Sequence, residues 1–584
     1  MCPTKEEREG LRQKIHHHLE VIYRDIPTEQ PLADLTDEIM QIMRYADEYQ
    51  EVGVHQNFWD QSEVILISYG DSLVDVGEKP LETLTHFLDS YGRKAITCVH
   101  ILPFFPYCSD DGFAVMDFYK VNEKLGDWEH IKNIASKYRL MADLVINHGS
   151  SQSEWFYNFV KGEGTGHDYF YRVPKGTDTS EVVRPRTTPL LQEVETQQGK
   201  QYVWCTFSPE QVDFDFTNTN VLKEFITIIR YYLDNGIRVF RLDAVAFLWK
   251  KLGTSCLNLP ETHELVRLIN TLIAPVQADA MIITETNIPN RENLSYFGNA
   301  NEAHGIYNFS LPPLLVNALI TGSCHYLKQW LMSMPPAQAG TFYLNFIASH
   351  DGIGLRPAEG LLTDNEIATF MSTMQSFGGE VSWRASENGT KKPYEINIAL
   401  FDALQGTLQG KDDYGLERFI CAHAIMLGLE GIPAIYIHSL LGTGNDYQKL
   451  AETGRKRSIN RHQWDYKALT QLLRKEGNQH YDCYTHLIAL IELRQKQAAF
   501  HPNATQFTLH MGDHLFGFWR QSIDRKQSIF CIYNISHRIQ ALHTADLNLI
   551  VTDSWYDLIT GSPLHENMDT IVFEPYQVMW ISNL

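Results

Sequence analysis

Long hydrophobic runs are absent from this sequence of 584 residues. No stretch reaches the ~18 uninterrupted apolar residues that are needed to span a bilayer. The first residues, MCPTKEEREG, have neither the basic segment nor the apolar segment of a secretory signal. Membrane spanning and export therefore have no support in the sequence, and we expect no membrane partner.

Paired cysteines are absent as well. The nine cysteines are odd in number, are scattered from Cys2 to Cys531 and include no C-x-x-C pair, which argues against a disulfide framework or a zinc knuckle. The run His16-His17-His18 suggests a metal site, but neighbouring residues of a helix point about 100° apart and cannot converge on one ion. The sequence therefore favours a reducing, cytoplasmic location and predicts no metal or other cofactor.

Basic residues are fewer than acidic residues in this sequence. Lys and Arg number 49 against 71 Asp and Glu, and the net charge of −22 would repel a phosphate backbone, so we expect no nucleic-acid partner.

Disorder and repeat architectures are also excluded, because 44% of the residues are hydrophobic and no internal repeat of fixed period occurs. A chain of this length exceeds one ordinary core and implies several domains or one elaborated barrel.

The sequence does contain a series of short aliphatic runs, separated by helical stretches such as KPLETLTHFLDSYG. Eight such runs indicate eight buried parallel strands, and their alternation with helices predicts an α/β fold, the (β/α)8 TIM barrel. The runs are VILIS from residue 64, ITCVHIL from 96, MADLVI from 141, IRVFRL from 237, MIITE from 281, GIYNF from 305, FYLNFIA from 342 and IPAIYIH from 432.

Further segments interrupt and flank the predicted barrel. About 90 residues follow the third run and about 80 the seventh, which predicts subdomains inserted after strands 3 and 7. Helical spacing from Leu11 to Ile22, and again from Leu35 to Tyr49, predicts a helical N-terminal extension, and alternating strands after residue 500 predict a C-terminal antiparallel β domain. The predicted divisions are the extension at 1–57, the barrel at 58–148, 219–352 and 418–495, the inserted domains at 149–218 and 353–417, and the β domain at 496–584.

Carboxylates follow three of the predicted strands. Asp243, Glu285 and Asp351 come after the fourth, fifth and seventh runs, so their side chains can converge at the C-terminal face of the barrel. Any one of them could instead be a buried structural acid or a helix cap. As a set they fit glycoside chemistry, in which one carboxylate attacks the anomeric carbon while a second carboxyl protonates the departing oxygen.

The position of Arg241 indicates how these roles are divided. Arg241 lies two residues before Asp243, so both side chains project to the same side of the strand, and the guanidinium can hold Asp243 ionised as the nucleophile. Glu285, beside an ionised carboxylate and partly desolvated, is expected to have the raised pKa of an acid/base. Asp351 can then stabilise the cationic transition state.

Seven short motifs show that the chain resembles the α-amylase superfamily, glycoside hydrolase family 13, over about residues 60–584. The resemblance implies the same three catalytic roles, and it adds His148, Arg241 and His350 as residues that bind the sugar at the cleavage point. The motifs are VHILPFFP at 99–106, DLVINH at 143–148, QVDFDF at 211–216, FRLDAV at 240–245, ITETN at 283–287, ASHD at 348–351 and GIPAIY at 431–436.

Within this superfamily the chain is similar to the sucrose phosphorylase group, through SDDGFAVMDFYKVNEKLGDW, GTSCLNLPETH, YNFSLPPLL, ASHDGIGL and SINRH. That match implies that Asp110 and Arg461 hold the hydroxyls of the glucosyl unit. A phosphorylase also needs a local cation for phosphate. The likeness implies that Arg186 handles phosphate together with Tyr394, although Arg184 and Arg186 could instead be surface residues.

The second insertion departs from the sucrose-specific pattern. Glu395 stands where sucrose-specific members have glutamine, and G-G-x-V-S followed by P-Y-E-I-N and F-D-A-L resembles the glucosylglycerate phosphorylase branch. The chain's length and its helical extension point the same way. Arg384, Lys391 and Lys392 are candidates for the carboxylate of glycerate, or else residues of a solvated loop.

We therefore expect a retaining phosphorylase that cleaves a small α-glucoside, glucosylglycerate, with phosphate to give glucose 1-phosphate. The partners are then the α-glucoside and inorganic phosphate, and the oligomeric state stays open, with a homodimer as one option. Sucrose phosphorylase, glucosylglycerol phosphorylase and an α-glucosidase or transglucosidase remain alternatives. A non-catalytic relative on the same fold is disfavoured by the intact set of acids.

Overall fold

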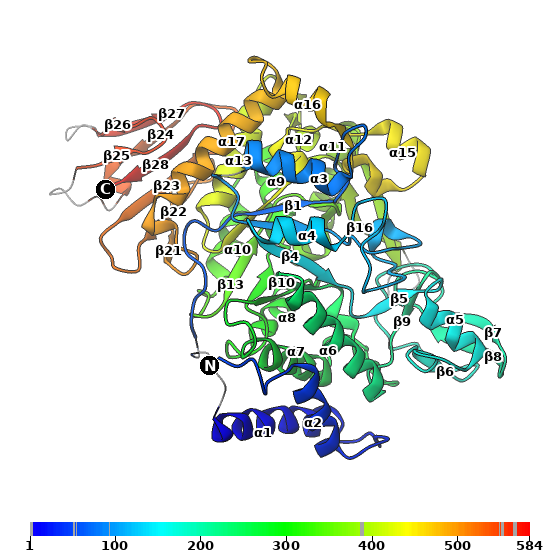
Figure 1. The fold of residues 1–584 in the computed structure, drawn as a ribbon. Coiled ribbons are helices and arrows are strands. Elements are labelled where there is room, and N and C mark those ends of the chain that lie inside the picture. Colours follow the sequence, from blue (N-terminus) through cyan, green and yellow to red (C-terminus); the bar gives the residue numbers. More distant parts are fainter. Residues whose placement is uncertain are drawn as a thin grey trace.

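The core of the protein is a closed barrel of eight parallel strands (Figure 1), so the predicted fold class is confirmed. The structure, a computed structural model, describes residues 4–50, 53, 55–92, 94–385, 391–547, 549, 554–564 and 569–584. Each predicted run supplies one strand, and each strand pairs with the next along the chain until β19 closes on β1. The strands are β1 Ile65–Ser68, β3 Cys98–Ile101, β4 Arg139–Leu144, β10 Ile237–Leu242, β11 Met281–Thr284, β12 Gly305–Tyr307, β13 Phe342–Asn345 and β19 Ile432–Tyr436.

Helices surround this barrel. In α6 the side chain of Asn218 accepts a hydrogen bond from the N–H of Asn220 and caps the helix, and the apolar face that follows is buried. The helices around the strands are α3 Pro80–Phe87, α4 Trp128–Ala135, α6 Thr219–Asp234, α7 Pro260–Ile273, α8 Asn290–Leu294, α9 Leu311–Thr321, α10 His325–Ser333, α13 Gly415–Gly428, α14 Ile437–Leu440, α15 Tyr447–Thr453, α16 Tyr466–Leu472 and α17 Gln479–Gln495. Among the described residues no helix is both long and apolar enough to cross a membrane.

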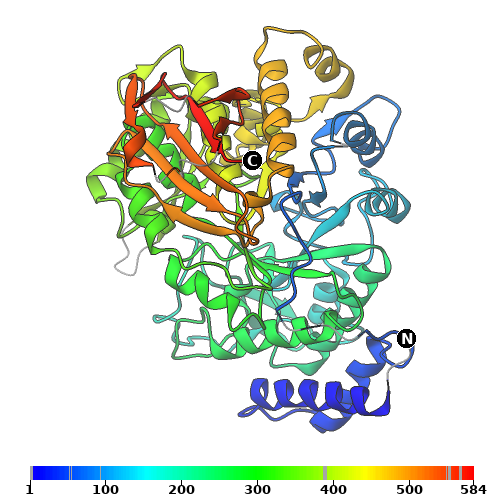
Figure 2. The same ribbon diagram turned by 90° about the vertical axis from the view of Figure 1, so that its left-hand side faces the viewer.

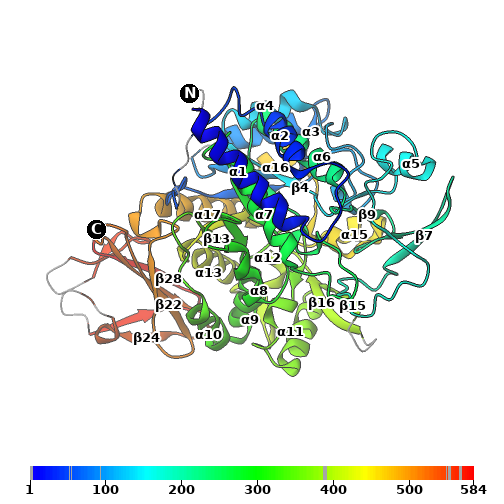
Figure 3. The same cartoon turned by 90° about the horizontal axis from the view of Figure 1, so that it is seen from below.

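The N-terminal segment forms two helices, α1 Lys5–Ile22 and α2 Leu32–Ile42. The buried face of α1 packs on α7, and Figure 3 shows the two helices together on the underside of the barrel. The predicted second helix was too long: α2 ends before Arg44, whose φ of 58° interrupts the helical backbone. His18 hydrogen-bonds Glu264 at 2.6 Å, and no metal-binding cluster of His, Cys, Asp and Glu occurs in the described part of the chain.

Two groups of elements interrupt the barrel after β4 and after β13. The first contains β5 His148–Ser150 paired with β9 Gln211–Asp213, the helix α5 Glu154–Lys161, and an antiparallel sheet of β6 Arg172–Val173, β8 Gly199–Trp204 and β7 Leu191–Thr196. The second contains α11 Asp364–Ser376, a sheet of β14 Ile353–Gly354, β16 Lys391–Asn397 and β15 Glu380–Ala385, the short helix α12 Leu400–Ala403, and β17 Gly406–Thr407 paired with β18 Gly410–Lys411. In Figures 1 and 3 the first group, and β16 with α11 of the second group, lie on the side of the barrel away from the C-terminal strands.

The C-terminal strands form an antiparallel sheet in the order β21-β22-β23-β28-β25-β26, which faces the viewer in Figure 2. The predicted C-terminal β structure is therefore confirmed. Its strands are β21 Thr505–Thr508, β22 Leu515–Gln521, β23 Ser528–Asn534, β25 Tyr556–Asp557, β26 Ser562–Pro563 and β28 Val578–Ser582, with β24 Gln540–His543 and β27 Thr570–Phe573 as a separate pair. None of the eight described cysteines forms a disulfide, and Cys2 lies outside the described residues.

Candidate active site

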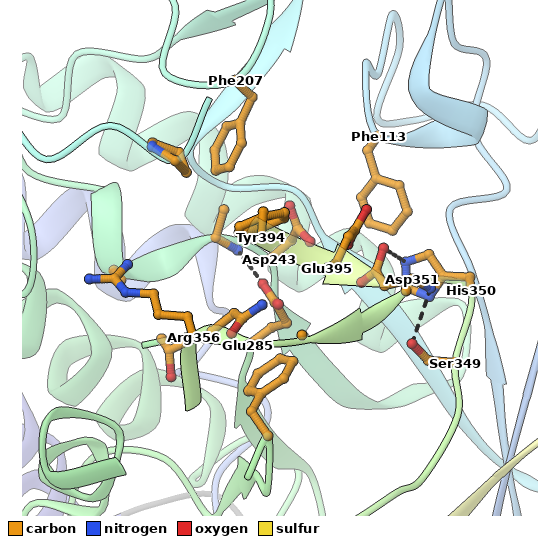
Figure 4. A pocket seen from close by; sticks show the side chains of 18 of the residues that line it. Phe113, Phe207, Asp243, Glu285, Ser349, His350, Asp351, Arg356, Tyr394 and Glu395 are labelled. Carbon is orange, nitrogen blue, oxygen red and sulfur yellow. Dashed lines mark hydrogen bonds and ion pairs between the residues drawn. The ribbon is translucent and has the colours of Figure 1, made fainter. Parts of the chain in front are cut away.

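The three predicted catalytic acids line one pocket at the C-terminal ends of the barrel strands (Figure 4). Asp243 directly follows β10, Glu285 directly follows β11, and Asp351 lies in the loop after β13. The close-up shows the three carboxyl groups in the middle of the pocket. The other predicted residues in its lining are Asp110, His148, Arg186, Arg241, His350, Tyr394 and Glu395.

Arg241 holds Asp243 in place. Its Nη1 donates a hydrogen bond to Oδ1 of Asp243 at 2.8 Å and also contacts Asp143, which His100 binds at 2.8 Å. The side chain of Arg241 is only 2% exposed, so the charge pair is shielded from water. This contact agrees with the predicted arrangement, in which Arg241 and Asp243 project to the same side because they are two residues apart on a strand.

Glu285 is positioned by backbone as well as by charge. The N–H of Ala244 donates to its Oε2 at 3.3 Å, and Ala244 has a φ of 53° at the turn after β10. Burial raises the pKa of Asp243 and of Glu285, and Arg241 opposes this effect at both carboxyls. Arg241 lies 2.8 Å from Asp243 but 3.9 Å from Glu285, so a single proton between the two carboxyls is more stable on Glu285.

Asp351 has the opposite electrostatic environment. Burial raises its pKa, but Arg457, 2.5 Å from Oδ1, and then His350 outweigh burial, so the pKa lies well below the usual range. Asp351 is therefore the carboxyl that stays ionised most readily, beside two carboxyls whose pKa burial raises. Glycoside cleavage through a covalent intermediate uses carboxyl groups with such different proton affinities.

Arg457 is a residue that the sequence analysis missed. Its Nε and Nη2 donate to the two carboxylate oxygens of Glu395, both at 2.9 Å, while its Nη1 contacts Asp351. The guanidinium therefore joins the carboxylate predicted to set acceptor choice to the one predicted to stabilise the transition state. The only sequence signal was the neighbouring SINRH motif, which begins directly after Arg457.

The histidines and Phe113 form one wall of the pocket. The His350 ring stacks on Phe113 with 5.1 Å between centroids, and His148 Nε2 lies 3.0 Å from the carbonyl oxygen of Phe113. Burial lowers the pKa of both histidines. Two neutral imidazoles beside an aromatic face suit a sugar ring with its hydroxyls.

Arg461 does not line this inner pocket. Its Nε donates to the carbonyl oxygen of His350 at 2.8 Å, and its Nη1 contacts Asp111, the residue that follows Asp110. Arg461 lines an outer pocket together with Asp110, Arg186 and Tyr394. A role for Asp110 and Arg461 in holding glucosyl hydroxyls stays a prediction.

The predicted phosphate residues lie together. The guanidinium of Arg186 is 4.8 Å from the centroid of the Tyr394 ring and 5.9 Å from that of Phe207. Within the described ranges Arg186 forms no ion pair with a carboxylate, so its charge is available to a ligand. Arg184 lies outside the pocket lining.

The cations suggested for a glycerate carboxylate are placed elsewhere. Arg384 pairs with Glu359 at 2.7 Å, Lys391 and Lys392 are exposed at the start of β16, and none of the three lines the pocket. The sequence analysis missed Arg356, which does line it. Because Arg356 lies in a loop two residues after Gly354, no strand-end pattern marked it.

Comparison with known proteins identifies relatives of this chain. Residues 81–352 match the family described as alpha amylase, catalytic domain. The glucosylglycerate phosphorylase of Spirochaeta thermophila is 38% identical over 90% of each chain, and that of Escherichia coli is 36% identical over 98% of this chain and 100% of its own. The crystal structure of sucrose 6F-phosphate phosphorylase from Thermoanaerobacter thermosaccharolyticum matches with a TM-score of 0.71, at 24% identity over 88% of this chain and 98% of its own.

The chain therefore belongs to the α-amylase superfamily of barrel enzymes. Within that superfamily it is a glycoside phosphorylase, an enzyme of glycosyltransferase type.

Proposed function

We propose that the protein is a retaining glucosylglycerate phosphorylase, which uses phosphate to convert glucosylglycerate into α-glucose 1-phosphate and glycerate. The observation that carries the proposal is the division of the pocket. One part of the pocket contains the carboxylates, which suit a cationic sugar centre. The other part contains Arg186, which has no carboxylate partner among the described residues and therefore suits an anion. The names of the relatives support the choice of glucoside.

The first half of the reaction forms a covalent intermediate. Asp243 attacks the anomeric carbon while Glu285 donates its proton to the glycosidic oxygen, so glycerate leaves as a neutral alcohol at that oxygen. Arg241 keeps Asp243 ionised before the attack, and Asp351 stabilises the positive charge that develops on the sugar ring. The glucosyl unit ends as an ester on Asp243.

The second half replaces glycerate with phosphate. A phosphate oxygen attacks the anomeric carbon, the ester bond to Asp243 breaks, and Glu285 takes up the proton that the attacking phosphate carries. Arg186 and Tyr394 hold the phosphate for this attack. Two inversions at one carbon restore the α configuration, as in glucose 1-phosphate.

The charge of Glu395 is compatible with the proposed anionic ligands. A free carboxylate beside the acceptor would repel both phosphate and glycerate, but Arg457 binds both oxygens of Glu395 and offsets its charge.

The location that we propose is a reducing cytoplasm, because none of the described cysteines forms a disulfide.

An assay of phosphate-dependent cleavage tests the proposed function. With phosphate present, we expect the purified enzyme to release glucose 1-phosphate from glucosylglycerate at least about tenfold faster than from glucosylglycerol or sucrose, a selectivity of ~1.4 kcal/mol. Without phosphate, sugar release should be a small fraction of that rate. A faster reaction with sucrose, or equal sugar release without phosphate, would reject the proposal in favour of a sucrose phosphorylase or a hydrolase.

Substituting Arg186 tests the phosphate site. Arg186→Gln should raise the KM for phosphate about 10- to 100-fold, because a charge-assisted contact to the anion is lost, and should leave background hydrolysis nearly unchanged. Initial rates against phosphate concentration measure this, with Arg184→Gln as the control outside the pocket. Equal losses in phosphorolysis and hydrolysis would contradict a specific phosphate role for Arg186.

A further inference from the structure

The pocket contains a second guanidinium, that of Arg356, which forms no ion pair with a carboxylate among the described residues. Arg356 begins a short 3-10 turn, Arg356–Ala358, and the preceding residue, Leu355, donates its N–H to the carbonyl oxygen of Tyr394 at 2.9 Å. This bond fixes the turn beside the tyrosine that Arg186 contacts from the other insertion. In the view of Figure 4, Arg356 lies on one side of Glu285, and Asp351 lies on the other.

The carboxylates near Arg356 act on it only at a distance, because their closest contacts are with other residues. Of the nearby carboxylates, Glu359 binds Arg384 and Glu292 accepts a hydrogen bond from Asn258, both at 2.7 Å, and neither forms an ion pair with Arg356. Burial, and then the positive charge of Arg384, lower the pKa of Arg356. A partly buried cation in these surroundings gains stability when an anion binds beside it.

An amide acceptor lies near the same turn. Asn287 lines the pocket, and its buried Oδ1 has no hydrogen-bond partner among the described residues. Gly354, two residues before Arg356, leaves the space that Asn287 occupies, since a Cβ on Gly354 would lie 3.1 Å from the Asn287 Nδ2. A guanidinium and a free amide oxygen can bind a carboxylate and a hydroxyl, the two groups that glycerate keeps when its other hydroxyl forms the glycosidic bond.

We propose that Arg356 binds the carboxylate of the acceptor and Asn287 the remaining hydroxyl, so that the pair selects a hydroxy acid over an uncharged polyol. This inference rests on the proposed function. The hydroxy acid and phosphate occupy the pocket one after the other, and each is then bound by its own arginine: Arg356 binds the hydroxy acid and Arg186 binds phosphate.

The test compares substrates that differ only in the carboxylate. In Arg356→Gln we expect kcat/KM for phosphorolysis of glucosylglycerate to fall about 10- to 150-fold, mainly through KM, the range for a lost hydrogen bond to a charged group. Phosphorolysis of glucosylglycerol and arsenolysis of glucose 1-phosphate, which involve no carboxylate, should change by less than about threefold. Arg291→Gln, at an exposed site on α8 outside the pocket lining, is the matched control.

Two further readouts separate binding from a structural role. Arg356→Lys, which keeps the charge but loses the planar fork, should recover part of the activity on glucosylglycerate. Free glycerate should inhibit arsenolysis by the wild-type enzyme and should inhibit the Arg356→Gln variant at least about tenfold more weakly.

Each other outcome has a defined meaning. Equal losses with both glucosides, or an equal loss in arsenolysis, would overturn the assignment, because Arg356 would then support the fold or bind phosphate. If the wild-type enzyme cleaves glucosylglycerate and Arg356→Gln retains that activity, only this inference fails. If the wild-type enzyme does not cleave glucosylglycerate, the proposed function fails, and this inference fails with it.

Discussion

Replacing Asp243 with asparagine is expected to reduce glucose 1-phosphate formation by at least about 10⁴-fold, the scale of loss seen when a catalytic nucleophile is removed. A carboxamide has the shape of the carboxylate, and its oxygen can still accept the hydrogen bond from Arg241, but it cannot form the glucosyl ester. A coupled assay measures the loss. An unchanged thermal melting curve shows that the fold is intact.

Two controls make the result specific. Asp215→Asn removes a carboxylate that binds Thr217 outside the pocket, and this variant should keep its activity within about twofold, as expected for a site away from the chemistry. In Asp243→Gly, added azide should attack from the vacated side and give a β-glucosyl azide. An Asp243→Asn variant that retains a tenth of the wild-type rate, or an azide product of the α configuration, would reject the covalent mechanism.

Replacing Glu285 with glutamine should have an effect that depends on the leaving group. Release of glycerate needs protonation of its alkoxide oxygen, so Glu285→Gln should slow glucosylglycerate cleavage about 10²- to 10⁴-fold. Fluoride leaves α-glucosyl fluoride without a proton, so the first step with that donor should slow by far less. Equal losses with both donors would contradict the role of Glu285 as the acid.

The same residue predicts the pH dependence of the wild-type enzyme. Because burial raises the pKa of Glu285, the protonated acid persists to higher pH than for an exposed glutamate and is lost as the pH rises through that pKa. The rate of glucosylglycerate cleavage should therefore fall on the alkaline side of the optimum, whereas the first step with glucosyl fluoride should lack this fall. A similar alkaline fall with both donors would assign the titration to another group.

The barrel could be predicted because its strands are buried on both faces. A strand such as β19 is then a continuous apolar run, and one such run was found for every strand of the barrel. The hairpins β7–β8 and β15–β16 in the insertions were not predicted individually. Their residues are largely polar and partly exposed, so no apolar run separates their strands from the surrounding loops.

The residues of the candidate site also fall into those that the sequence pattern marked and those that it did not. Asp243 and Glu285 follow strands, and the ends of parallel strands must meet, so their convergence followed from their position. Arg457 gave no such signal, because its contact with Glu395 joins residues 62 apart in the sequence and depends on how the second insertion folds back. Nor could spacing decide which of the adjacent residues Asp110 and Asp111 pairs with Arg461.

The bridge that Arg457 forms between Glu395 and Asp351 limits how this enzyme can be redesigned. A substitution at Glu395 intended to admit a new acceptor would remove both hydrogen bonds between Arg457 and Glu395, while the contact of Arg457 with Asp351 would remain. The balance of charge at the anomeric carbon would then shift with acceptor choice. Changes of specificity and of turnover are therefore coupled, and libraries that vary positions 395 and 457 together should contain active variants that single-site libraries lack.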